Sequence, residues 1–116
     1  MKKLLLNPEI IAIDQDPLGK PGGRRTKYPG SIEVWTRELS GGELAVAVYF
    51  DAPGRFALEA VRVGWTAPLV AVRDVVNRRS LGVFRRDTKI GVESSTAHSV
   101  RCFRLSRLFQ GPATIV

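Results

Sequence analysis

The stretch IEVWTRELSGGELAVAVYF, residues 32–50, decides the fold class of this chain. In residues 32–37 branched apolar side chains alternate with charged or aromatic ones, and in residues 44–50 Leu, Val, Val and Phe occupy every second position. A period of two is typical of β-strands, and the Ser-Gly-Gly between the two runs is typical of a turn. The stretch therefore predicts a β-hairpin. Its second strand has Ala and Tyr at the intervening positions, so we expect that strand to be central and covered on both faces.

Several more short apolar runs follow the hairpin, and turn signals such as Asp-Ala-Pro-Gly at residues 51–54 separate them. Many short strands divided by turns indicate an antiparallel sandwich or barrel. We predict an all-β fold, an antiparallel Greek-key β-sandwich with a short N-terminal helix. The further strands are expected at residues 56–63, 70–75, 81–84, 89–93 and 100–105.

The N-terminal residues follow a helical period instead. Asn7 is a favourable N-cap, Pro8 suits the first helical position, and Pro17 ends the pattern within about two turns. A helix this short is marginal unless it packs on another surface. We therefore expect it to dock on the sandwich, on a second copy of the chain or on a separate protein. The docking stripe would be the apolar side chains at helical spacing, Leu6, Ile10 and Ile13.

The chain divides into three parts by composition. Residues 19–30 contain four glycines and two prolines among basic residues, which indicates a linker or long loop. We assign residues 1–30 to the helix and linker, residues 31–110 to the β-sandwich and residues 111–116 to a tail. At 116 residues the chain fits one domain. A (β/α)8 barrel would need roughly 250 residues.

Net charge and apolar runs indicate which kinds of partner to expect, and the cysteine content indicates the role of Cys102. The formal net charge is +7, which favours contact with polyanions or acidic surfaces. The basic residues are spread along the chain, however, as on a solvated exterior. Aromatic side chains do not alternate with basic ones, so the pattern argues against a nucleic-acid partner. No apolar run approaches membrane-spanning length, and we expect no membrane contact. Cys102, the one cysteine, is expected to be a small buried side chain on a strand.

Four segments, in order, carry a resemblance to a known family. Residues 6–20, LNPEIIAIDQDPLGK, closely resemble the segment that leaves the catalytic barrel in α-galactosidases of glycoside hydrolase family 27, the melibiases. Residues 32–50 resemble the first strands of the β-sandwich that follows in that family. Residues 72–76, with Leu-Gly at 81–82, and residues 97–105 are similar to later strands of that sandwich.

The departures from the family pattern cluster in the second half of the chain. Val76 replaces an expected Trp, Asp51 stands near an expected Asn, and the prolines expected before His98 are missing. These differences are consistent with a degenerate or remodelled copy of the domain.

The resemblance implies a domain without chemistry of its own. Family members are retaining glycosidases, acting on α-galactosides or α-N-acetylgalactosaminides with two catalytic aspartates on barrel strands. No position of this chain matches either aspartate motif, so we assign no catalytic residue, no cofactor and no metal, and we expect no activity from the chain alone. The resemblance also implies a secreted or lysosomal protein, although no signal peptide is evident.

Two further groups of polar residues could carry chemistry. Asp14 and Asp16 could act as a carboxylate pair, but an Asp before Pro17 is more typical of a turn. His98 could join a serine–histidine–aspartate site, but no nucleophile-elbow motif surrounds the nearby serines. A single histidine without a Cys or acidic cluster also makes a poor metal site. We expect His98 to close the turn before the last strand.

Three aromatic residues, Trp35, Tyr49 and Trp65, are the candidates for sugar or interface contacts, because flat aromatic side chains suit both. Trp35 lies on the strand face opposite Ile32 and Val34. We expect it to be exposed or to be buried against a neighbouring domain, and we favour interface packing over sugar binding.

The sequence predicts a non-catalytic C-terminal β-sandwich domain that supports or docks on a catalytic barrel, which this chain lacks. The alternatives are a stand-alone carbohydrate-binding module, a basic nucleic-acid-binding domain, and a truncated reading frame without a selected role. The predicted partners are therefore a catalytic barrel, a second copy of the chain through the N-terminal helix, or carbohydrate.

Overall fold

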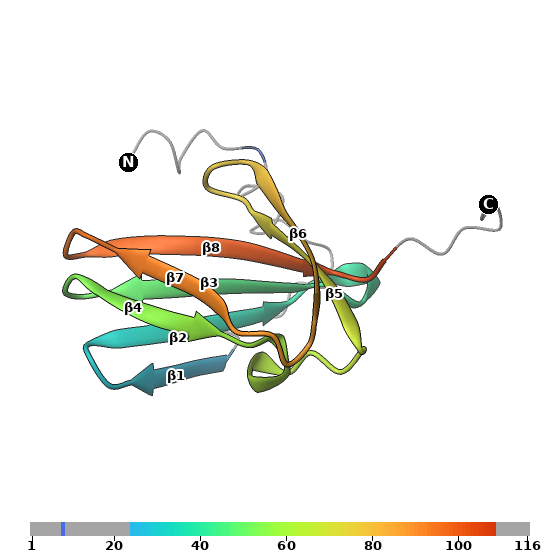
Figure 1. The fold of residues 1–116 in the computed structure, drawn as a ribbon, viewed down its shortest axis with the longest axis horizontal. Helices are drawn as coiled ribbons and strands as arrows, with labels where there is room; N and C mark the ends of the chain where they lie inside the picture. The colour runs from blue at the N-terminus through green and yellow to red at the C-terminus, as the bar shows by residue number, and fades with distance from the viewer. Residues whose placement is uncertain (1–7, 9–23, 109–116) are drawn as a thin grey trace, which may run out of the picture.

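The computed structural model describes residue 8 and residues 24–108, which Figure 1 draws as a ribbon. These residues form antiparallel strands in two sheets, as the sequence predicts. The predicted helix with its stripe Leu6, Ile10 and Ile13 lies outside the described residues. The strands are β1 Arg24–Tyr28, β2 Ile32–Glu38, β3 Leu44–Phe50, β4 Gly54–Leu58, β5 Leu69–Asp74, β6 Arg79–Arg85, β7 Ile90–Ser94 and β8 Ser99–Ser106, and two short 3-10 helices are η1 Ser40–Gly42 and η2 Ala60–Val63.

The two sheets differ in size. The large sheet has the strand order β1-β2-β3-β8-β5-β6, and the small sheet pairs β4 with β7. In Figure 1 the small sheet lies in front of the large one, and the β5–β6 hairpin turns steeply across the end of the other strands. The chain enters the small sheet at β4, leaves it at β5, and re-enters it at β7 before β8 inserts between β3 and β5. These crossings are Greek-key connections.

The predicted hairpin at residues 32–50 forms β2 and β3, which η1 joins. The register pairs Val34 with Val48, and both side chains are buried between the sheets. β3 lies between β2 and β8 in the large sheet, so the prediction of a central strand is confirmed. Its second face is only partly covered, because Ala47 and Tyr49 are half-buried.

The predicted loop at residues 19–30 is wrong for its second half, where β1 pairs with β2 along the sheet edge. The sequence of β1, Arg-Arg-Thr-Lys-Tyr, lacks apolar alternation. An edge strand bonds a neighbour on one side only and does not require a fully buried face, so its sequence signal is weak. The glycines and prolines on both sides of β1 favour a loop, which is why the sequence predicts one there.

The predicted strand at residues 56–63 is also wrong in its second half. β4 ends at Leu58, and the chain then turns into η2, where Ala60 and Val63 are buried at a spacing of one 3-10 turn. Gly64 ends this helix in the left-handed region at φ 102°, and its amide donates to the carbonyl oxygens of Ala60 and Val61. Two of the four residues of η2 are valines, which favour strands, so the sequence did not indicate a helical turn there.

The core fills the space between the sheets with aliphatic and aromatic side chains. The largest fully buried ones are Phe50, Leu58, Leu105, Val34, Val46, Val48, Val70, Val72 and Val75. Except for Val75, which follows β5, they belong to one cluster to which both sheets contribute, so the small sheet closes the inner face of the large one. We call the other face of the large sheet the outer face.

Asp74 is the buried charged residue of the described core and it shapes the β5–β6 turn. Its Oδ1 accepts hydrogen bonds from the backbone amides of Val76 at 3.1 Å and Asn77 at 3.0 Å, and its Oδ2 accepts one from Asn77 Nδ2 at 2.8 Å. A carboxylate that bonds amides two and three residues ahead forms an Asx-type turn. Asp74 of the Arg-Asp segment at residues 73–74 therefore stabilises the β5–β6 turn.

Candidate functional site

The outer face carries a row of side chains that crosses three strands. Trp35 of β2 pairs with Ala47 of β3, and Ala47 pairs with Cys102 of β8. Residues that pair directly in antiparallel strands lie on the same face, so the three side chains are neighbours. Trp35 remains 40% exposed, whereas Ala47 and Cys102 are half-buried. An indole beside two small side chains makes a shallow apolar surface, and Trp35 is exposed on the face opposite Ile32 and Val34.

The next row toward the η1 end is basic. Arg37, Ala45, Arg104 and Arg73 pair in succession across β2, β3, β8 and β5. The Nε of Arg104 donates to Oε1 of Glu43 at 2.7 Å, and both side chains are about two-thirds buried or more, with exposures of 30% and 26%. This contact fixes one guanidinium in place. The outer face therefore combines an exposed indole with a row of arginines, of which Arg104 is held by Glu43.

Cys102 lies within the apolar row and is a poor nucleophile. Burial, and to a lesser degree the negative charge of Asp74, raises the pKa of the Cys102 thiol to about 11. A thiol with so high a pKa is protonated near neutral pH, and the thiolate is the reactive form. Cys102 is a free cysteine on a strand, where the sequence predicts a small apolar side chain.

The two turns at one end of the sandwich meet through Tyr49, Asp51 and His98. Nδ1 of His98 lies 3.1 Å from Oη of Tyr49 and 3.1 Å from Oδ1 of Asp51. Burial, with the nearby Asp51 charge, raises the pKa of the Tyr49 phenol. His98 has a φ of 53° and lies in the turn before β8, where the sequence predicts it. Tyr49 is thus engaged within the chain.

The candidate serine–histidine–aspartate site is not assembled by these contacts. The hydroxyl oxygens of Ser94 and Ser99 lie within hydrogen-bonding distance of each other, and each also lies near the carbonyl oxygen of Thr96, at 2.9 and 3.1 Å, so their two protons are shared among three contacts. His98 contacts Tyr49 and Asp51 instead. The serines therefore close the β7–β8 turn. Asp14 and Asp16, the other candidate pair, lie outside the described residues.

Trp65 is placed differently from Trp35. Its side chain is only 6% exposed, and its Nε1 donates to the carbonyl oxygen of Leu69 at 3.1 Å. A buried indole whose N–H is bonded within the chain serves packing. Trp65 is therefore a core residue and not a surface contact.

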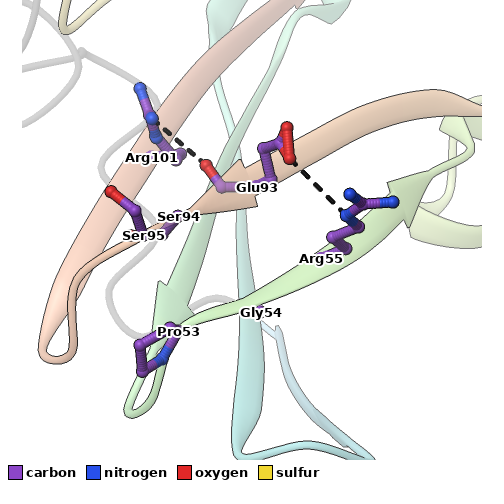
Figure 2. Close-up of a pocket in the computed structure, with 7 residues that line it drawn as sticks. All are labelled: Pro53, Gly54, Arg55, Glu93, Ser94, Ser95 and Arg101. Atoms are coloured by element: carbon purple, nitrogen blue, oxygen red, sulfur yellow. Dashed lines mark hydrogen bonds and ion pairs between the residues drawn. The ribbon is translucent and has the colours of Figure 1, made fainter.

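A groove that sequence reasoning missed opens on the small-sheet side, at the end of β4 and β7 (Figure 2). Its volume is about 560 Å³. Nε of Arg55 lies 3.6 Å from Oε1 of Glu93, and the guanidinium of Arg101 donates to the Glu93 carbonyl oxygen at 3.1 Å. Arg101 lies on the same face of β8 as the buried Phe103 and Leu105. A charged residue at an inward-facing strand position was the sequence signal that could have indicated this groove. The groove is lined by Pro53, Gly54, Arg55, Glu93, Ser94, Ser95 and Arg101.

The described part of the chain has neither a metal-binding cluster nor a membrane-spanning helix. Within residues 24–108, His, Cys, Asp and Glu side chains do not gather in threes that could hold a metal ion. None of the helical turns described there is long and apolar enough to cross a membrane. The expectation that the chain uses no cofactor stays a prediction.

Comparison with known proteins gives one family model, described as the alpha galactosidase C-terminal beta sandwich domain, which matches residues 29–105. An α-galactosidase of Coffea arabica is 33% identical over 95 residues, which are 82% of this chain and 24% of that protein. Alpha-galactosidase A of Homo sapiens is 49% identical over 47 residues, 40% of this chain and 11% of that protein. The chain thus spans about a quarter or less of these relatives.

Solved structures agree on the fold. Alpha-galactosidase I of Mortierella vinacea superposes with a TM-score of 0.76 at 22% identity, covering 90% of this chain and 28% of that one. A β-L-arabinopyranosidase of glycoside hydrolase family 27 from Geobacillus stearothermophilus gives a TM-score of 0.75 at 20% identity, covering 92% and 24%. At these identities the superpositions show a shared β-sandwich.

Proposed function

Because the chain belongs to the family of α-galactosidase C-terminal β-sandwich domains, we propose that it is a non-catalytic domain that docks on a catalytic barrel and supports it. The sandwich itself occupies the described residues 24–108. A retaining glycosidase needs two carboxyl groups roughly 5 Å apart in a sugar-binding cleft. Catalysis would then belong to the partner.

The observation that carries this proposal is the outer face of the large sheet. Trp35 is 40% exposed there beside the small side chains of Ala47 and Cys102, and the Arg104–Glu43 pair is ordered next to them. Tryptophan and arginine are the residue types that dominate interface energetics when a partner covers them. A barrel surface with an apolar patch and an acidic rim would complement this face.

Binding to a barrel tests the proposal directly. A family 27 α-galactosidase barrel without its own C-terminal domain is mixed with this chain, and complex formation is followed by size-exclusion chromatography and calorimetry. We expect a complex that Trp35→Lys weakens by at least about tenfold, since hot-spot aromatics contribute about 2 kcal/mol or more. Val61→Lys is the matched control, because Val61 is 43% exposed but lies on η2, away from the outer face.

Two results would count against docking. Equal binding by the Trp35→Lys and Val61→Lys variants would remove the outer face from the interface. Hydrolysis of a chromogenic α-galactoside by the purified chain, above the rate of a blank, would contradict a non-catalytic role. We expect no turnover from the chain alone.

Trp35 also favours a second candidate, a stand-alone carbohydrate-binding module. An exposed indole can stack on the apolar face of a sugar ring. Titration with galactose-containing oligosaccharides, followed by tryptophan fluorescence, discriminates the two functions. A saturable fluorescence change, together with loss of sugar binding by Trp35→Ala in an NMR titration, would favour sugar binding. No change at millimolar sugar would favour docking.

A further inference from the structure

The groove in Figure 2 contains two guanidinium groups and one carboxylate. The carboxylate of Glu93 faces Arg55, which is its cross-strand partner in the β4–β7 register. The guanidinium of Arg101 contacts the backbone carbonyl oxygen of Glu93 and not its carboxylate. Among the described contacts, the positive charge of Arg101 is therefore not matched by a carboxylate.

Arg101 is held in position by the fold. It pairs with Val48 in the β3–β8 register and so lies on the inner side of the large sheet, where the small sheet ends. One of its five N–H groups is used by the bond to Glu93 at 3.1 Å. The other donors belong to the same planar guanidinium, whose fork matches the two oxygens of a carboxylate or sulfate. A fork that is already oriented loses less side-chain entropy on binding.

We propose that this groove binds an oxyanion, a carboxylate or sulfate group carried by a small hydrophilic ligand such as an acidic sugar. Arg101 provides the charged fork. Figure 2 shows the Ser95 hydroxyl group on the same side of the groove, where it can donate a further hydrogen bond. A volume of about 560 Å³ lies within the range of small-molecule sites.

The site goes beyond the proposed function and is independent of it. Arg55 and Glu93 lie on the small sheet, and the groove opens on that side, opposite the face proposed to meet a barrel. Loss of barrel docking in Trp35→Lys would leave anion binding unchanged. Loss of anion binding would leave docking unchanged. The two proposals therefore fail separately.

The experiment compares galacturonate with galactose, which differ by a carboxylate in place of a hydroxymethyl group, on the full chain by NMR titration. We expect galacturonate to bind with a Kd of about 1 mM, typical of a ligand of this size at an open site. Galactose should bind at least about tenfold more weakly, because a charge-assisted hydrogen bond is lost. Shifts should centre on the amides around Ser95 and Arg101.

The variants are matched in charge. Arg101→Gln should weaken galacturonate binding by at least about tenfold. Arg85→Gln removes the same charge from the far end of β6, where Arg85 pairs with Leu69, and should leave binding unchanged. Glu93→Gln should strengthen binding, because it removes a negative charge that repels the anion and that pairs with Arg55. If Arg101→Gln does not fold, Arg101→Lys keeps the charge without the fork and should still bind severalfold more weakly.

The outcomes decide the proposal. Equal affinity for galactose and galacturonate, or binding unaffected by both Arg101 variants, would overturn it. Sulfate that competes with galacturonate and shifts the same amides would support the shared oxyanion chemistry. Sulfate that binds as tightly as galacturonate would assign the site to a free anion, and weaker sulfate binding would assign it to an acidic sugar.

Discussion

At the scale of single residues, the side chain of Asp74 stabilises the fold more than its exposed neighbours do. It is buried and accepts three hydrogen bonds from Val76 and Asn77. Asp74→Ala should therefore lower the free energy of unfolding by about 2 kcal/mol, since buried hydrogen bonds to a charged group are lost. Urea unfolding measures this. Asp87→Ala is the control and should change stability by less than about 0.5 kcal/mol, because Asp87 is exposed and its pair with Arg85 is weak.

Cys102 makes a prediction about pH. The folded pKa of its thiol is about 11, raised from 9.0 mainly by burial. Between these two values the unfolded chain loses the thiol proton while the folded chain keeps it, so the folded state binds more protons. Stability should then fall as the pH rises from 9.0 toward 11, by up to about 2–3 kcal/mol. The Cys102→Ala variant should lack this share of the slope, and an identical slope in both proteins would contradict the buried thiol.

The two tryptophans show what sequence can predict about one residue. Trp35 alternates with Ile32 and Val34 on a regular strand, so its parity placed it on the outer face, and the structure agrees. Trp65 follows Gly64, whose φ of 102° reverses the chain. No period operates across such a turn, so burial of Trp65 could not be inferred from its neighbours.

At the scale of elements, the β2–β3 hairpin could be predicted because its alternation is strong and its turn is short. β1 could not, because a polar edge strand is specified by backbone pairing with β2 more than by its own side chains. The end of η2 depends on Gly64 in the left-handed region, and the valines at residues 61 and 63 indicate a strand instead of this helical turn. The predicted element boundaries were wrong where backbone pairing or a special backbone conformation, and not side-chain periodicity, sets the boundary.

Gly64 provides the test at this scale. Its φ of 102° is unfavourable for a residue with a Cβ, although a Cβ there would meet nothing within 4 Å. Gly64→Ala should therefore destabilise the domain by about 1–2 kcal/mol through backbone strain alone. Gly91 also has open space around its Cβ position but no positive φ, so Gly91→Ala should be neutral or slightly stabilising. Equal changes in stability for the two variants, measured by thermal unfolding, would contradict the need for a left-handed glycine at residue 64.

At the scale of the whole molecule, the unequal sheets set where the two proposed binding surfaces lie. The small sheet covers the inner face of the large one, and the outer face is left with Trp35 and the arginine row. The outer-face tryptophan could be predicted from local alternation. The Arg101 groove could not, because it depends on the β3–β8 register and on where the β4–β7 sheet ends. Both are set by pairings between residues far apart in the chain.

Amide hydrogen exchange tests the whole arrangement. β3 and β8 have hydrogen-bonded neighbours on both sides, and their inner side chains Val48 and Leu105 are fully buried. We expect their amides to exchange slowest, at a free energy close to that of global unfolding. β1 and β6 are the edge strands of the large sheet and should exchange at least about 100-fold faster, through local opening. Protection in β6 equal to that in β3 would contradict the strand order. Because Ala47 and Cys102 lie on β3 and β8, this pattern would place the apolar row of the outer face on the most rigid strands, which lowers the entropy lost when a partner docks.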